Sequence, residues 1–183
     1  VAVRNGKIVA VGTRKAVHAA EHGPKTVIVD LKGRTLIPGF VDAHGHISGV
    51  GMQAVSANLL PPPDGPVQSI ADIQRIMRDF IATSPAVKSS GFAIGFDYDD
   101  SQLVEKRAPT RQELDAVSTE IPIMVIHQSG HLGAFNSKAI AMAGITADTP
   151  NPSGGVIQRE ADGRTPNGVF EESGLALIAY KIM

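Results

Sequence analysis

From Leu36 onward, short apolar runs with strand character alternate with segments whose apolar residues recur at helical spacing. The segment from Ile70 to Ala82 is the clearest helix, because apolar residues recur every three or four positions and Ser69 precedes them as an N-cap. Alternation of strands and helices favours parallel β-α units over a β-sandwich. The sequence therefore predicts an α/β fold for this part of the chain.

Local signals set the expected bounds of the other elements. Thr110 and Glu113 have the spacing of a capping box, and Gly144 suits the left-handed position after a helix. The stretch 151–168 is rich in Gly, Pro, Asn and Asp and is expected to be an excursion between elements. We expect strands at 36–41, 92–96, 121–127 and 156–159, and helices at 70–82, 110–117, 136–143 and 170–182.

The first 30 residues follow a different pattern. Asn5-Gly6 separates two short β-rich runs, and this pair is a strong hairpin signal because both residues tolerate positive φ. A third such run lies at 27–29. We therefore expect residues 1–35 to form part of a small antiparallel subdomain, with residues 36–183 forming the α/β domain.

Bulk composition excludes several classes of protein. The net charge of -1 and the lack of any Lys/Arg-rich run argue against a nucleic-acid partner. No apolar run reaches the roughly 18 residues of a membrane span, so we expect a cytoplasmic protein without membrane contacts. The chain begins without Met and stops inside an apolar helical pattern, which predicts that it is part of a longer protein.

A pair of histidines follows the first apolar run of the α/β domain. Side chains alternate along a strand, so His44, His46 and the preceding Asp42 are expected to point to the same side. Asp42 could then accept an N–H from a ligating imidazole, which fixes the tautomer of that ring. Because the chain has no cysteine, histidine and carboxylate are its strong metal ligands. The spacing indicates a metal site, although a His-x-His pair also occurs by chance in loops.

The residues around these histidines carry a family resemblance. The run 37–46 closely resembles the Pro-Gly-Phe-Val-Asp-x-His-x-His signature of the amidohydrolase superfamily, and 5–12 is similar to a hairpin of its small β-subdomain. Later motifs resemble the branch called amidohydrolase family 3, which includes N-substituted formamide deformylases. The resemblance covers nearly the whole chain, as the N-terminal portion of such a protein, and its later motifs lie at 129–131, 136–139, 144–145, 154–155 and 168–172.

This resemblance implies a TIM (β/α)8 barrel, of which the chain forms part, preceded by a small β-sandwich subdomain. It implies one or two divalent metal ions, with zinc expected, and it makes His44 and His46 metal ligands. Glu172, in preference to Glu171, is the expected carboxylate that completes the site. A bound metal lowers the pKa of its water to about 7, which supplies a hydroxide for hydrolysis of an amide or formamide C–N bond in a small molecule.

Other polar residues have two interpretations each. His131 lies in a glycine-flanked loop, where it could hydrogen-bond the substrate or a tetrahedral intermediate, and His127 is the weaker candidate. Glu172 could instead simply favour the positive N-terminal end of a helix. The acidic residues at 97, 99 and 100 are expected to form a solvated loop rather than a cation site.

Three functional hypotheses follow from the sequence. The first is a metal-dependent amidohydrolase whose remaining ligands and general acid/base lie beyond residue 183, so that this fragment alone is inactive and needs the rest of its chain. The second is a non-catalytic metal-binding or structural remnant of the fold. The third is a deaminase or cyclic amidase of the same superfamily. The sequence leaves the substrate, the metal and the oligomeric state open, a homo-oligomer included.

Overall fold

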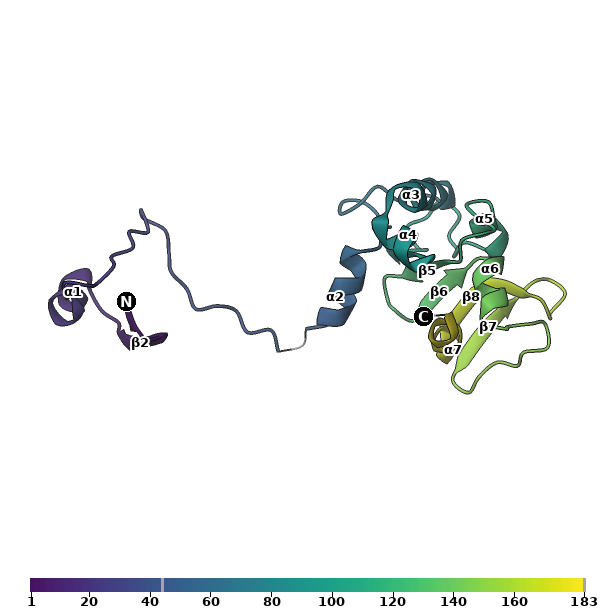
Figure 1. Cartoon of the computed structure of the whole chain (residues 1–183). Coiled ribbons are helices and arrows are strands. Elements are labelled where there is room, and N and C mark those ends of the chain that lie inside the picture. The colour runs from purple at the N-terminus through teal and green to yellow at the C-terminus, as the bar shows by residue number, and fades with distance from the viewer. Residues whose placement is uncertain (44, 183) are drawn as a thin grey trace. The chain divides into compact units, whose positions relative to one another are not determined.

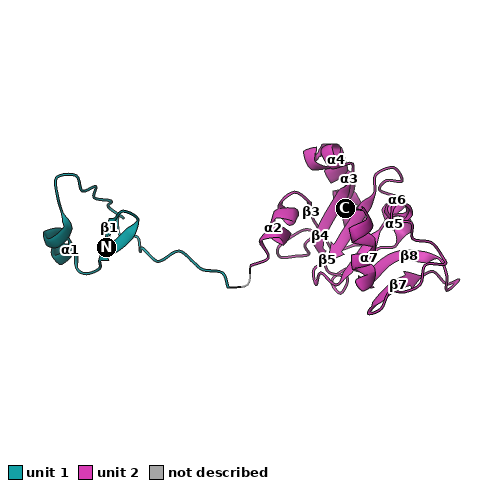
Figure 2. Ribbon diagram, turned by 60° about the horizontal axis from the view of Figure 1, so that its bottom comes forward, with its two compact units in different colours: residues 1–44 teal, residues 45–183 magenta. Residues whose placement is uncertain are grey.

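The computed structural model describes residues 1–43 and 45–182, and the chain divides into two compact units (Figures 1 and 2). The first unit is Val1–His44 and the second is Gly45–Met183. Each has its own hydrogen-bonded strands, and each is described below by itself. Across the described residues, no helix has the length and apolar character that crossing a membrane requires.

The first unit opens with the predicted hairpin. Strands β1 (Ala2–Arg4) and β2 (Lys7–Ala10) pair antiparallel, and Asn5 and Gly6 connect them with φ of 52° and 73°. Helix α1 (Arg14–Glu21) follows, and the side chain of Thr13 caps its N-terminus. The hairpin prediction is therefore confirmed, whereas the assignment of residues 1–35 to a β-sandwich stays a prediction.

The strands expected at 27–29 and 36–41 are absent from the described residues. The apolar side chains of the second segment lie in solvent, with Phe40 94% and Val41 92% exposed. A strand needs a neighbour that satisfies its backbone N–H and C=O groups. No strand within 1–43 or 45–182 pairs with 36–41, so the prediction of a strand there is wrong for this chain.

The second unit is built on one six-stranded sheet with the order β3-β4-β5-β6-β8-β7. Strands β3, β4 and β5 are parallel, as predicted, but the remaining pairs are antiparallel. The turn between β5 and β6 is too short for the crossover that a parallel pair needs. The strands are β3 (Ala57–Asn58), β4 (Ala93–Tyr98), β5 (Ile123–His127), β6 (Leu132–Phe135), β7 (Gly155–Arg159) and β8 (Pro166–Glu172).

The described residues of this unit form six helices, and three of these begin as the sequence predicts. Ser69 accepts from the backbone of Asp72, and the capping box of Thr110 and Glu113 is complete. Asn136 caps the third, as predicted. The helices are α2 (Ile47–Ala54), α3 (Ile70–Thr83), α4 (Pro85–Ser90), α5 (Arg111–Asp115), α6 (Ser137–Met142) and α7 (Ser173–Ile182).

The sheet is buried on both faces. Ile123 and Val125 of β5 belong to one apolar cluster, which α3 and α5 complete, whereas Met124 and Ile126 belong to a second, which α6 and α7 complete. Alternate residues of a strand point to opposite faces, so one continuous apolar run serves both clusters. The expected α/β architecture is therefore confirmed for this unit.

One edge of the sheet collects the polar residues that the sequence singles out. The carboxyl ends of β4 and β5 lie at this edge because the two strands are parallel. The amino end of β6 and the carboxyl end of β8 lie there too, since β6 runs opposite to both β5 and β8. The polar residues at these strand ends are Asp97, Asp99, Asp100, His127, His131 and Glu172.

Candidate active site

The end of β4 is irregular at Asp97. Phe96 pairs with Ile126 and Tyr98 with His127, so Asp97 has no partner in the register and forms a bulge. Its backbone is left-handed, with φ of 78°, a conformation that Asp tolerates better than most residues. A bulge changes the direction in which a side chain points, and this bulge brings the carboxylate of Asp97 to helix α2.

Gln53 of α2 donates from Nε2 to both carboxylate oxygens of Asp97, at 3.2 Å and 3.1 Å. Burial raises the pKa of Asp97, and the hydrogen bond from Gln53 opposes this by favouring the charged form. Sequence patterns did not indicate this contact, because a single glutamine in an exposed helix carries no signal of a distant partner.

Tyr98 is the next residue and is fully buried. Its hydroxyl has no hydrogen-bond partner among the residues that the structure describes, and its ring lies edge-on to that of His127 with centroids 5.3 Å apart. Burial raises the pKa of Tyr98 far above its usual value, and the negative charge of Asp100 adds to the effect. The phenol therefore stays neutral.

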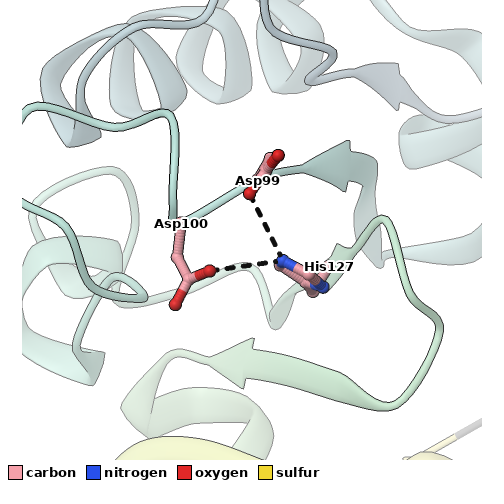
Figure 3. Close-up of side chains that lie close together, drawn as sticks. All are labelled: Asp99, Asp100 and His127. Carbon is pink, nitrogen blue, oxygen red and sulfur yellow. Dashed lines mark ion pairs between the residues drawn. The ribbon is translucent and has the colours of Figure 1, made fainter.

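Asp99, Asp100 and His127 form a cluster at the ends of β4 and β5 (Figure 3). Nε2 of His127 lies 3.8 Å from Oδ1 of Asp99 and 3.4 Å from Oδ1 of Asp100. Asp99 is buried, contrary to the expected solvated loop, and hydrogen bonds from Ser101 and Gln102 hold its pKa below the usual range. Asp99 is therefore a carboxylate.

Three candidate metal-binding atoms of this cluster lie within 4.8 Å of one another. However, the backbone N–H of Ser129 donates to Nδ1 of His127 at 3.1 Å, so Nδ1 carries the lone pair and the proton of the neutral ring sits on Nε2. A metal here would need that lone pair on Nε2, facing the aspartates. The geometry therefore fits a hydrogen-bonded polar cluster, and His127 would have to change tautomer and leave Ser129 to bind a cation.

His131 and Glu172 are brought together from positions 41 residues apart. Nδ1 of His131 lies 2.9 Å from Oε2 of Glu172, and the backbone N–H of Glu172 donates to the carbonyl of His131 at 2.8 Å. Both side chains are more than half exposed. A carboxylate only accepts, so Nδ1 donates to it and Nε2 of the neutral ring presents its lone pair to solvent.

The residues of the His-x-His motif are described in part. His46 is the N-cap residue of α2, and Asp42 lies exposed in the first unit. His44 lies outside the described residues. The convergence of His44 and His46 on one metal ion, and the contact of Asp42 with either of them, therefore stay predictions.

Comparisons with known proteins agree with the motif. The model of an amidohydrolase family matches residues 27–183. An N-substituted formamide deformylase of Arthrobacter pascens is 34% identical over 97% of this chain and 31% of its own length. An exoenzymes regulatory protein of Pectobacterium carotovorum is 31% identical over 94% of this chain and 36% of its own length.

The structure has a solved counterpart. An uncharacterized metal-dependent hydrolase from Pyrococcus horikoshii matches with a TM-score of 0.59 and 23% identity, over 98% of this chain and 31% of that chain. The chain thus spans about a third of the length of these proteins. With the family model matching most of its residues, the chain belongs to the amidohydrolase family, in the family 3 branch, as an N-terminal portion.

Proposed function

We propose that the protein carrying this chain is a metal-dependent hydrolase that cleaves non-peptide C–N bonds, in amides or formamides, with a metal-activated water. The observation that carries the proposal is the Pro-Gly-Phe-Val-Asp-x-His-x-His signature at 38–46, inside a segment that the family model matches from residue 27 to 183. The relative named as an N-substituted formamide deformylase supports this type of bond. The substrate in this proposal is a small molecule.

The donor chemistry of the chain fits a divalent metal such as zinc. Imidazole nitrogens of His44 and His46 and a carboxylate oxygen of Glu172 would hold the ion, and such nitrogen and oxygen ligands suit Zn²⁺. In this proposal Asp42 accepts an N–H from one of the two imidazoles and fixes its tautomer. When bound, the ion supplies an acidified water and polarises the scissile carbonyl.

The role of His131 follows from its contact with Glu172. Glu172 has two carboxylate oxygens, and Oε2 accepts from Nδ1 of His131. This bond orients the ring and leaves its Nε2 free to accept or return a proton at the substrate. We therefore assign His131 to proton handling or hydrogen bonding at the reacting carbonyl, and Glu172 to the metal and to the orientation of His131. The adjacent start of α7 at Ser173 also suits the simpler interpretation of Glu172 as a helix-terminal acid.

The fold implied by the proposal is larger than the one described. The parallel strands β3, β4 and β5 would be part of a TIM barrel, and the hairpin of the first unit would be part of a β-sandwich subdomain. Both would be completed by the remainder of the same polypeptide, which would also supply further ligands. The 183-residue chain by itself is therefore expected to be inactive.

A non-catalytic role is the alternative that one observation favours. A relative with 31% identity is named as an exoenzymes regulatory protein, so a protein similar to this chain can carry the name of a regulator and not of an enzyme. In this alternative the histidine pair binds metal weakly or serves only the fold. The two proposals differ in whether turnover accompanies metal binding.

The test uses the full-length protein and measures its metal content by plasma mass spectrometry beside turnover of N-substituted formamides. We compare the wild type with His44→Ala/His46→Ala and Glu172→Gln. Glu171→Gln is the matched control, because this neighbouring carboxylate accepts from Gln158 at 2.6 Å. We expect stoichiometric metal and turnover in the wild type and the control, and loss of both with the two histidine substitutions. A folded wild type that binds no metal after zinc loading would contradict the proposal, and metal without turnover would favour the regulatory alternative.

A further inference from the structure

We propose that Asp97 is a positioning residue, which through its two hydrogen bonds with Gln53 sets the orientation of α2 and thereby the place of His46, where that helix begins. The inference rests on the proposed function, since it concerns how one metal ligand is aligned. Asp97 is not assigned to the metal or to the reacting atoms. It acts only through Gln53 and the helix.

The backbone conformation at Asp97 directs its side chain out of the regular alternation of β4. Its φ of 78° is left-handed, a conformation that costs most non-glycine residues roughly 1 kcal/mol or more and Asp less. Without the bulge, Asp97 would pair in the β4–β5 ladder like its neighbours and its side chain would follow the alternation of the strand. The bulge instead gives both carboxylate oxygens to one amide on another element.

Helix α2 needs an external tether. It has eight residues, and two of them are Gly49 and Gly51, each of which weakens a helix by about 1 kcal/mol relative to alanine. All eight residues are described, and none is buried. Helices this short are marginal without tertiary contacts. Among the described residues, the hydrogen bonds from Gln53 to Asp97 connect this helix to the end of β4, in addition to the chain connection from α2 to β3.

The geometry of a helix transmits this effect to His46. Gln53 lies in the last turn and His46 lies at the N-cap, which separates them by seven residues, or about 10 Å along the axis. A change in the direction of the helix at Gln53 therefore moves His46 by a distance that matters for a metal bond of about 2.0 Å. On the apolar side of the helix, Met52 and Val55 line a cavity together with Phe80 and Phe92.

The test measures zinc affinity of the full-length protein by competition with a chromogenic chelator. Gln53→Glu sets two carboxylates against each other, and we expect it to weaken zinc binding about tenfold, within the range seen when supporting groups of metal ligands are lost. The double substitution Gln53→Glu/Asp97→Asn exchanges donor and acceptor, and we expect it to restore affinity to within about threefold of the wild type. Asp97→Asn alone keeps an acceptor oxygen and should have the smaller effect of the two single changes.

The matched control is Gln112→Glu. Gln112 also donates to a carboxylate, Oε1 of Glu160 at 2.6 Å, but this pair lies away from the edge that carries the candidate site. The same change of charge there should leave zinc affinity unchanged. The thermal midpoint of each metal-free variant is measured in parallel. A general loss of stability would lower the thermal midpoint and the zinc affinity together, in Gln53→Glu and in Gln112→Glu alike.

The outcomes separate this inference from the proposed function. A wild type that binds zinc, with Gln53→Glu unchanged in affinity, overturns the role of Asp97 and leaves the proposed function intact. Failure of the double substitution to restore affinity, in folded protein, also overturns it. A wild type that binds no zinc contradicts the proposed function itself, and the inference falls with it.

Discussion

The two units of the chain differ in how far they bury their apolar side chains. In Val1–His44, the aromatic side chain of Phe40 is 94% exposed, whereas Phe135 and Phe170 in Gly45–Met183 are fully buried against each other. Hydrophobicity does not explain the difference, since the run Leu36–Val41 is as apolar as many strands of the second unit. The difference is whether neighbouring strands pair with the run.

This comparison bears on function because the His-x-His motif follows the unpaired run directly. In the second unit, local signals and long-range pairing agree, and polar side chains collect at one edge of the sheet. In the first unit, the local signal for a strand is present, but its partners would have to come from elsewhere in the protein.

The largest loss of stability in the second unit is expected at Asn136, which is fully buried. Its Oδ1 accepts from the backbone N–H of Ile123 and Ala139, and its Nδ2 donates to two carbonyls. Because Asn136→Ala leaves these buried groups without partners, we expect the free energy of unfolding to fall by about 3 kcal/mol or more. Urea denaturation of the 183-residue chain measures this, with Asn151→Ala, an exposed asparagine that makes one such bond, as a control expected near 1 kcal/mol or below. Equal losses in both variants would show that the buried hydrogen bonds of Asn136 are not the reason for its effect.

Gly168 should give the next largest effect. Its φ is 109°, and an added Cβ would lie 2.5 Å from the backbone nitrogen of Arg111 and 2.9 Å from the carbonyl oxygen of Phe135. We expect Gly168→Ala to lower the free energy of unfolding by about 2 kcal/mol, from strain and overlap together. Gly163→Ala isolates the strain, because φ there is 68° and the space is open. If Gly163→Ala costs as much as Gly168→Ala, close packing of β8 is not the reason.

Acid should weaken the second unit through Glu113. Arg107 and Thr110 hydrogen-bond this carboxylate and lower its pKa from 4.5 to about 2. A lowered folded-state pKa contributes stability that is present above pH 4.5 and is lost as the pH falls towards 2. Since Glu113 is partly exposed, we expect the loss to be about 1 kcal/mol, as a difference in urea unfolding between pH 5 and pH 2.5. Glu113→Gln should remove this component, and an unchanged pH dependence in that variant would assign it to other carboxylates.

The smallest effect is expected in the unpaired run itself. Phe40→Ser should change the free energy of unfolding of the 183-residue chain by less than about 0.5 kcal/mol, because the side chain is already in solvent. In the full-length protein, where the proposed barrel would bury it, the same substitution should cost about 3 kcal/mol. Denaturation of the two proteins side by side measures the contrast. A large loss in the short chain would show that the run packs there already.

The second unit was largely predictable from local signals. The caps at Ser69, Thr110 and Asn136 depend on residues only a few positions away, so sequence suffices to find them. The antiparallel β6 is not predictable from local signals, because Leu132 and Gly133 follow β5 so closely that the glycine-flanked sequence favours a loop there. The amino end of β6 and Glu172 of β8 lie at the edge with the polar residues because β6 pairs antiparallel with both β5 and β8.

The sequence predicts which residue types form the candidate site, but not which of these residues contact each other. The motif types indicated imidazole and carboxylate ligands, yet nothing local to His131 or Glu172 reveals that they share a hydrogen bond across 41 residues. The bulge at Asp97 was also unpredictable, because it depends on the register between β4 and β5. Asp99 is buried, and three hydrogen bonds from Ser101 and Gln102 satisfy its carboxylate.

The proposed ligands His44, His46 and Glu172 can be tested by locating the metal in crystals of the zinc-loaded full-length protein, by anomalous scattering at the zinc absorption edge. We expect a peak about 2.0 to 2.2 Å from nitrogens of His44 and His46 and from a carboxylate oxygen of Glu172. Zinc bound instead at Asp99, Asp100 and His127, with the His-x-His motif and Glu172 left unliganded, would contradict this expectation.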